Sequence, residues 1–232
     1  MKQIVAMGGG GFSMEPENPL LDDFILGLTG KPRPKVCFVP TATGDHEGYV
    51  QKFYDAFPAE RAEAAHLALF HRTVRDLRAF VLSQDVIYVG GGNTVSLLAV
   101  WRAHGLDVVL REAWEAGVVL CGVSAGALCW FEGGTTDSFG NGLAPLGDGL
   151  GFLPGSCCPH HDGEAERRPL YQELISGGVL PDGLAVDDSA ALYFVGTQLV
   201  EAVSSVPNAR AYQVERHGDA VTETPLPTRF LG

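Results

Sequence analysis

The chain has 232 residues, of which 46% are hydrophobic and 19% are charged, so it can bury a large core and is not a disordered chain. Its formal charge of −12 excludes a basic surface for nucleic acid or an anionic membrane, and an anionic substrate would need local arginines. Five cysteines without zinc-type spacing predict no disulfide framework. Neither a signal-peptide core nor an apolar run of membrane length is found, so we expect a cytoplasmic protein.

Short apolar runs alternate with longer amphipathic stretches along the first half of the chain, a pattern typical of alternating strands and helices. Strands are expected at Gln3–Met7, Lys35–Val39, Ala65–Phe70, Asp85–Val89 and Val118–Cys121. Helices are expected at Leu20–Leu28, Glu47–Phe57, Val74–Leu82, Thr94–Ala103 and Leu106–Ala116. Because these strands are almost continuously apolar, we predict a mostly parallel sheet with helices on both faces.

The C-terminal part of the chain has a different pattern. Short strands separated by turns are expected at Leu192–Val195, Leu199–Val203, Ala211–Val214 and Val221–Thr224, antiparallel and at one edge of the sheet. No internal repeat, low-complexity tract or linker divides the chain. The sequence therefore predicts one α/β domain over residues 1–232, built as a three-layer sandwich.

The sharpest motif is Gly122-Val123-Ser124-Ala125-Gly126, which follows the apolar run Val118–Cys121 and precedes helix-compatible residues. A G-x-S-x-G sequence between a strand and a helix is typical of a nucleophilic serine on a sharp turn, with the next backbone N–H aimed at an oxyanion. The alternative is an ordinary strand–helix connection that Ser124 caps. Cys121 and Cys129 flank the turn and are expected to pack as small apolar residues.

A second glycine-rich turn, Val89-Gly90-Gly91-Gly92-Asn93-Thr94, also joins a strand to a helix. Since the carboxyl ends of parallel strands meet at one edge, a glycine N–H here can supply the second oxyanion donor, and Gly91 and Asn93 can approach the substrate. A phosphate loop is the alternative, although the lysine of a Walker motif is missing. The run Gly8–Gly11 is too weak a signal for any assigned chemistry.

A serine nucleophile needs a general base, and a histidine is the natural candidate. Of the pair in Pro159-His160-His161-Asp162 we favour His160, against the alternative of two solvated loop histidines. The carboxylate that orients it is sought among Asp187, Asp188 and Asp137, and spacing does not decide between them. With Asp188 the chain order is Ser, His, Asp, which is unlike the order in α/β-hydrolases.

Six segments in their order along the chain give the sequence a resemblance to the peptidase E family of serine peptidases, or aspartyl dipeptidases, with cyanophycinases as relatives. The segments cover roughly the first 200 positions and are Gly8–Phe12, Val39–Ala42, Val89–Thr94, Gly122–Gly126, Thr135–Asp137 and Pro159-His160. The resemblance implies a fold like the class I glutamine amidotransferases (flavodoxin-like), with serine in place of their cysteine. It also implies cleavage of dipeptides with an N-terminal aspartate, without metal or cofactor.

The resemblance also implies a role for each matching residue. They are Ser124 as nucleophile, His160 as base, Gly92 and Ala125 as oxyanion donors, Asp137 in the active site, and Arg167 and Arg168 on the substrate's acidic side chain. The family's triad acid is a glutamate, and Asp188, which is one methylene shorter, falls near its place. The alternatives are an exopeptidase of different specificity, a cyanophycinase-like hydrolase, and a non-catalytic binding domain. A small peptide is the expected partner, and a homodimer stays open.

Overall fold

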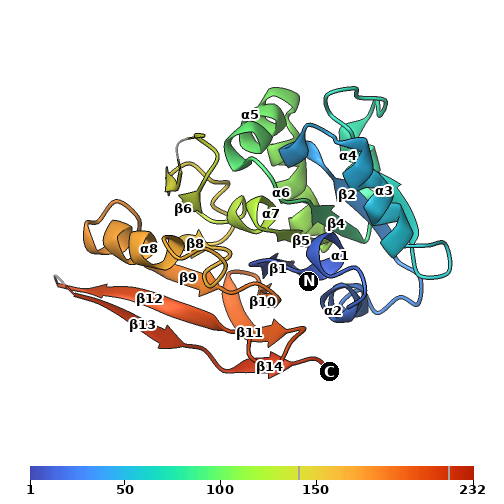
Figure 1. The fold of residues 1–232 in the computed structure, drawn as a ribbon. Helices are drawn as coiled ribbons and strands as arrows, with labels where there is room; N and C mark the ends of the chain where they lie inside the picture. Colours follow the sequence, from blue (N-terminus) through green and yellow to red (C-terminus); the bar gives the residue numbers. More distant parts are fainter. Residues whose placement is uncertain (141, 219) are drawn as a thin grey trace.

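The computed structural model describes residues 1–140, 142–218 and 220–232, which form two β-sheets covered by helices (Figure 1). In these residues the larger sheet has eight strands in the order β14-β11-β10-β1-β5-β4-β2-β3. The smaller sheet has six strands in the order β13-β12-β9-β8-β6-β7. The fold is therefore α/β with a central parallel sheet, as the sequence predicted.

Five neighbouring strands of the larger sheet run parallel: β1 (Gln3–Met7), β5 (Val119–Val123), β4 (Val86–Val89), β2 (Lys35–Val39) and β3 (Glu63–His66). Their residues alternate between two separate cores. Ile4 and Ala6 of β1 belong to one hydrophobic cluster, and Val5 and Met7 belong to the other. Because both faces are buried, these strands are apolar throughout, which is the pattern that made them predictable.

Helices cover the two faces of the larger sheet and complete three layers (Figure 1). One face packs on α1 (Gly11–Met14), α2 (Leu20–Gly27) and α3 (Glu47–Ala56), and the other packs on α4 (Leu77–Leu82), α5 (Thr94–His104) and α6 (Leu106–Ala116). A 3₁₀ turn, η1 (Thr41–Thr43), precedes α3. In the described part of the chain, no helix is both long and apolar enough to cross a membrane.

The smaller sheet was not predicted. It comprises β6 (Gly133–Thr136), β7 (Ala144–Leu146), β8 (Ser156–Cys158), β9 (Gly183–Val186), β12 (Ala211–His217) and β13 (Ala220–Pro225), and α8 (Arg167–Ser176) packs on it. Its first four strands have only three or four residues each, too few for a periodic pattern. Within it, β6, β8 and β9 run parallel.

The C-terminal strands divide between the two sheets, which corrects one expectation. The strands β10 (Ala190–Val195) and β11 (Gln198–Ser204) extend the larger sheet in antiparallel fashion, and β14 (Thr228–Phe230) closes its edge. The strands β12 and β13 are antiparallel as predicted, but they belong to the smaller sheet. The sequence pattern predicted these strands but not the sheet to which each belongs, because sheet membership depends on pairing with distant segments.

Candidate active site

Ser124 lies on a sharp turn between β5 and α7 (Ala125–Leu128). Its backbone has φ 56° and ψ −112°, a strained conformation for a residue with a side chain. The flanking glycines make the turn feasible, since a Cβ on Gly122 would lie 2.2 Å from the carbonyl oxygen of Gly126. A Cβ on Gly126 would lie 2.3 Å from the carbonyl oxygen of Val89 in the neighbouring strand. Both glycines of the motif are therefore required by backbone contact.

The glycine-rich loop after β4 lies directly against the serine. A Cβ on Gly91 would be 3.3 Å from Cβ of Ser124, and one on Gly92, whose φ is 135°, would be 2.5 Å from the carbonyl oxygen of Ala42. The N–H of Gly91 donates to the hydroxyl of Tyr49 at 3.2 Å. Within the described residues, the N–H groups of Gly92 and Ala125 have no acceptor, so both are free to bind an oxyanion.

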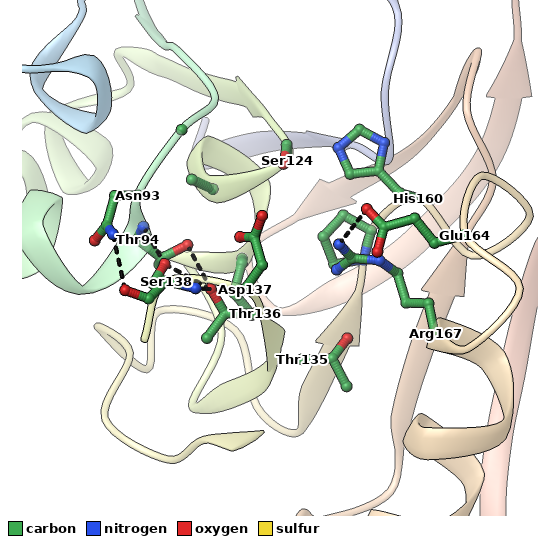
Figure 2. Close-up of a pocket in the computed structure, with 14 residues that line it drawn as sticks. Asn93, Thr94, Ser124, Thr135, Thr136, Asp137, Ser138, His160, Glu164 and Arg167 are labelled. Carbon is green, nitrogen blue, oxygen red and sulfur yellow. Dashed lines mark hydrogen bonds and ion pairs between the residues drawn. The ribbon is translucent and has the colours of Figure 1, made fainter. Parts of the chain in front are cut away.

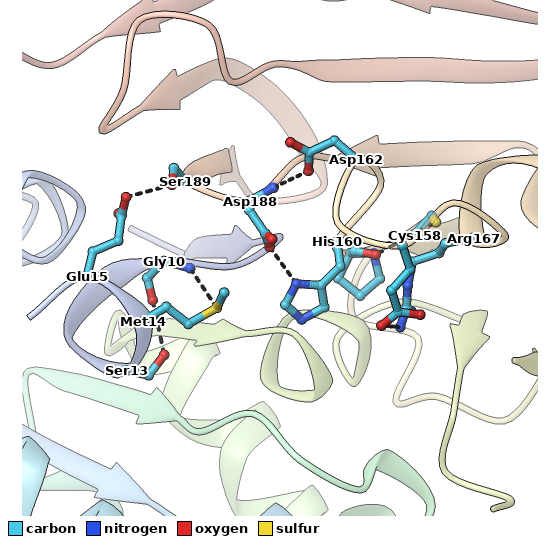
Figure 3. A network of polar contacts seen from close by, with 12 residues as sticks. Gly10, Ser13, Met14, Glu15, Cys158, His160, Asp162, Arg167, Asp188 and Ser189 are labelled. Atoms are coloured by element: carbon cyan, nitrogen blue, oxygen red, sulfur yellow. Dashed lines mark hydrogen bonds and ion pairs between the residues drawn. The ribbon is translucent and has the colours of Figure 1, made fainter. Parts of the chain in front are cut away.

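His160 and Asp188 form a close pair beside the serine. His160 follows β8, Asp188 follows β9, and Nδ1 of His160 lies 2.5 Å from Oδ1 of Asp188 (Figure 3). The N–H of Asp188 donates to Oδ1 of Asp162 at 2.8 Å, which fixes the position of the carboxylate-bearing loop. His160 lines the same two pockets as Ser124, so the paired histidine and the strained serine belong to one site.

The N-terminal glycine run, to which the sequence analysis assigned no chemistry, makes room for this pair. A Cβ on Gly9 would lie 2.0 Å from Oδ1 of Asp188, and a Cβ on Gly8 would lie 2.3 Å from the carbonyl oxygen of Asp187. On the other side, a Cβ on Gly163 would lie 2.9 Å from Oδ2 of Asp188. The glycines therefore allow a backbone loop to bring Asp188 to His160.

Backbone strain is concentrated at this site. Of the four non-glycine residues with positive φ in the described chain, three are Ser124, His160 (53°) and Ser189 (63°), which directly follows Asp188. Such conformations cost free energy and persist only where the surrounding structure fixes them. Ser189 is held by its hydroxyl, which donates to Oε1 of Glu15 at 2.6 Å. The strain supports a functional role for this group of residues.

A polar pocket of about 300 Å³ opens beside Ser124, between the two sheets (Figure 2). Its charged residues are Asp137, Glu164 and Arg167. The side chain of Arg167 is only 4% exposed, and its Nη2 donates to Oε1 of Glu164 at 3.0 Å. Within the described residues, Nε of Arg167 has no acceptor. Arg167 therefore places a guanidinium in the wall of the pocket, a group that suits a carboxylate of a ligand.

Asp137 follows β6 and lines the pocket with an exposed side chain. In the described part of the chain, no hydrogen bond or ion pair engages its carboxylate. The neighbouring Asn93 also lines the pocket, but its side chain is occupied. Oδ1 of Asn93 accepts from the N–H of Ser96 at 2.8 Å and so caps α5, and its Nδ2 donates to the carbonyl of Ser138 at 2.9 Å. Asn93 thus fixes the Asp137 loop.

Three residues from the sequence analysis lie away from this pocket. Arg168, expected on the substrate, forms an ion pair with Glu223 and does not line the pocket. Nε2 of His161 lies 3.0 Å from Oε2 of Glu223, and burial lowers the pKa of this histidine. Asp187 is buried, and its Oδ2 accepts from the backbone N–H of Arg210 at 3.0 Å. Burial raises the pKa of Asp187 to about 6.

Glu164, Ser138 and Tyr49 line the two pockets and were not predicted from the sequence. The first two lie in loops without a recognisable motif, and Tyr49 reads as a core residue of α3. The cysteines match expectation, since all five are free and buried, and burial raises the pKa of the Cys121 and Cys129 thiols well above the usual value. Among the described residues, no group of three or more His, Cys, Asp or Glu side chains is placed to hold a metal ion.

Comparisons with known proteins agree on one family. The sequence model of Peptidase family S51 matches residues 4–202. The uncharacterized peptidase YgaJ of Bacillus subtilis (strain 168) is 54% identical over 232 residues, which is 100% of both chains. Peptidase E of Pasteurella multocida (strain Pm70) is 28% identical over 215 residues, 85% of this chain and 88% of its own. A solved peptidase from an acI-B1 Actinobacterium has a TM-score of 0.71 at 17% identity, covering 98% of this chain and 95% of its own.

Proposed function

The chain belongs to peptidase family S51 and is a peptidase; we propose that it is a serine exopeptidase that cleaves dipeptides with an N-terminal aspartate. The observation that carries the proposal is the geometry around Ser124. A strained serine, a histidine paired with Asp188 and two free backbone N–H groups all border one pocket. These are the nucleophile, the oriented base and the oxyanion donors that acyl transfer requires.

In the proposed first step, Ser124 Oγ attacks the peptide carbonyl while His160 takes the hydroxyl proton. The Oγ–C bond forms, and the carbonyl oxygen becomes an oxyanion held by the N–H groups of Gly92 and Ala125. Asp188 keeps Nδ1 of His160 protonated and stabilises the imidazolium that forms. Since α7 begins at Ala125, the N-terminal end of that short helix faces the developing charge.

In the second half, His160 returns the proton to the leaving amine as the C–N bond breaks. This step leaves an ester between the aspartyl residue and Ser124. A water molecule then attacks this ester, with His160 acting again as general base, and the free aspartate leaves. Apart from this water molecule, these steps need no co-reactant to balance.

The polar pocket supports the proposed preference for aspartate. A substrate carboxylate can accept from the guanidinium of Arg167, which lines the pocket. The free amino group of the substrate can bind the carboxylate of Asp137. A pocket of about 300 Å³ is at the small end of ligand sites and fits one short residue better than a polymer. We therefore favour a dipeptidase over a cyanophycinase-like hydrolase.

A cytoplasmic location is part of the proposal. Its support is that all five cysteines are free, two of them adjacent in sequence at Cys157 and Cys158. Free thiols are typical of proteins that fold in a reducing compartment.

The proposal is tested with Ser124→Ala and a panel of Asp-X, Glu-X and Ala-X dipeptides. We expect the variant to lose about 10⁴-fold to 10⁶-fold in kcat, as triad serines do, with an unchanged fold. A fluorophosphonate should label the wild-type protein and not the variant. Ser83→Ala, which changes an exposed serine at the end of α4, is the matched control and should keep full activity. Activity retained in Ser124→Ala, or a wild-type protein without dipeptidase activity, would contradict the proposal.

A further inference from the structure

A second cavity of about 490 Å³ borders Ser124 on the side away from Asp137. Ser124, His160 and Gly92 line both cavities, so the reacting groups lie between them. The second cavity is formed by the segment after β1, which contains Ser13 and Met14, and by the start of α3. Figure 3 shows Ser13 and Met14 near the His160 ring, on the side opposite Arg167.

The two cavities have opposite charge. Asp137 and Glu164 line the first cavity, where Arg167 is already paired with Glu164. Lys52 and His46 line the second cavity, and within the described residues no aspartate or glutamate does. Lys52 is exposed and forms no ion pair with any described residue. In a protein with a net charge of −12, an unpaired lysine beside a reactive serine favours an anionic group of the ligand.

Part of the wall of the second cavity is apolar. Met14, Tyr49 and Val123 line it, and the Tyr49 ring lies 4.9 Å from the ring of Phe38, centroid to centroid. The Tyr49 hydroxyl is fixed by the N–H of Gly91 at 3.2 Å. Tyr49 and Lys52 are three residues apart on α3, so their side chains lie on the same face of that helix. The cavity thus combines space for an apolar side chain with one cation.

We propose that this second cavity binds the residue after the scissile bond, with Lys52 holding its free α-carboxylate. The inference rests on the proposed function and deepens it. A dipeptide has an ammonium group at one end and a carboxylate at the other. The two cavities match these terminal charges in one orientation, in which the side-chain carboxylate of the aspartate lies near Arg167 in the first cavity. The ammonium lies at Asp137, the carboxylate lies at Lys52, and the scissile bond lies between Ser124 and His160. His160 protonates the amine as the C–N bond breaks, and the released amino acid leaves through the second cavity.

The orientation also predicts substrate length. A free carboxylate at Lys52 belongs to a dipeptide, whereas a tripeptide or a C-terminal amide would place an uncharged amide group there. We therefore expect the enzyme to prefer Asp-Leu to Asp-leucinamide, with the preference expressed in KM rather than in kcat. An interaction that is equal in the ground state and the transition state changes KM alone.

The experiment measures kcat and KM for Asp-Leu and Asp-leucinamide in the wild-type protein, Lys52→Ala and Lys52→Arg. We expect Lys52→Ala to raise KM for Asp-Leu by about 5-fold to 30-fold, the loss of one charge-assisted hydrogen bond, and to leave the amide within about 2-fold. Lys52→Arg should keep the preference for the free acid. The matched control is Lys31→Ala, which removes an exposed lysine that is paired with Asp85 far from Ser124.

Two results would overturn the inference while the proposed function stands. One is a wild-type enzyme that cleaves both substrates equally well, and the other is a Lys52→Ala variant that loses both equally. In each case, hydrolysis that disappears in Ser124→Ala shows that the serine chemistry is intact and that only the placement of the leaving residue is wrong. If instead Ser124→Ala keeps its activity, the proposed function fails, and the inference fails with it.

Discussion

The two sheets build the candidate site by the same geometric rule but from different kinds of sequence. In the larger sheet, the carboxyl ends of β1, β4 and β5 present three glycine-rich turns, and Ser124 is on the last of them. In the smaller sheet, the carboxyl ends of β6, β8 and β9 present Asp137, His160 and Asp188. In both sheets, parallel neighbours bring distant segments to one edge.

The difference lies in how each set is held. The turns of the larger sheet are fixed by backbone-to-backbone contact, where a single added Cβ would approach a carbonyl oxygen to 2.2–2.5 Å. The side chains of the smaller sheet are held by hydrogen bonds such as the one from Asp188 N–H to Asp162. Steric contacts between backbones tolerate no substitution, whereas a loop held by side chains can change. The serine turn is therefore held by the fold itself, whereas Asp137, His160 and Asp188 lie on loops that side-chain contacts support.

After Ser124→Ala, the largest expected effect is on the smaller sheet's side of the site. Asp188→Asn should lower kcat by about 10³-fold to 10⁴-fold, because the amide cannot stabilise the imidazolium of His160. Asp137→Asn is the comparison variant and should mainly raise KM, since its carboxylate lies in the pocket beside Ser124, the proposed substrate site. Steady-state kinetics with Asp-Leu distinguishes the two. A larger loss of kcat in Asp137→Asn than in Asp188→Asn would make Asp137 the orienting acid.

The next largest effect is expected from a substitution that disturbs the backbone contact between Gly126 and Val89 in the larger sheet. Gly126→Ala should lower the free energy of unfolding by about 2–4 kcal/mol, because its Cβ would lie 2.3 Å from the carbonyl oxygen of Val89. Activity should fall together with stability, since the same shift moves Ser124. Gly27→Ala, in α2 with no atom within 4 Å of the added Cβ, is the matched control. Urea unfolding measures the free energy of unfolding of each variant. Equal values for Gly126→Ala and Gly27→Ala would show that the Cβ contact does not destabilise the fold.

A smaller effect concerns the two adjacent arginines at the start of α8. Arg167→Ala should lower kcat/KM for Asp-Leu by about 10-fold to 100-fold and reduce the preference over Ala-Leu, because it removes the guanidinium from the pocket. Arg168→Ala should leave that preference unchanged, since Arg168 pairs with Glu223 outside the pocket. The ratio of kcat/KM for the two dipeptides is the measurement. If the ratio changes in Arg168→Ala and not in Arg167→Ala, Arg168 is the arginine that binds the substrate.

The smallest effect tests a buried carboxyl under the larger sheet. Burial raises the pKa of Asp22 from 3.8 to about 6, and the Tyr88 hydroxyl donates to it at 3.0 Å. Between these two pH values the folded protein binds more protons than the unfolded chain, so the contribution of Asp22 to stability is present near pH 4 and is lost as the pH rises through 6. Between pH 4.5 and pH 8, the free energy of unfolding of the wild type should therefore fall by up to about 2 kcal/mol relative to that of Asp22→Asn.

This pH dependence is measured by urea unfolding from pH 4.5 to pH 8. Asp23→Asn is the matched control, because the neighbouring Asp23 side chain is 57% exposed and forms an ion pair with Arg61. Parallel stability profiles for the wild type and Asp22→Asn would show that Asp22 is ionised in the folded protein at every pH tested.

Local sequence patterns were enough to predict the parallel core, the α2, α3, α5 and α6 helices and the serine turn. These features follow from local patterns. The strands β1 and β2 have the predicted bounds, and Gly122 is required because a Cβ there would contact Gly126, four residues along the chain. Apolar strands buried on both faces and a turn that excludes Cβ atoms leave signals that do not depend on the remainder of the chain.

Which acid pairs with His160, and which arginine lines the pocket, became clear from the three-dimensional structure alone. Asp188 is 28 residues from His160 along the chain, and its neighbour Asp187 has the same chemistry but is turned under Arg210. Arg167 and Arg168 differ by one step along α8, which directs one guanidinium into the pocket and the other to Glu223. These choices depend on how β6, β8 and β9 pack beside the larger sheet, and strands of three or four residues leave no periodic pattern from which that packing can be predicted.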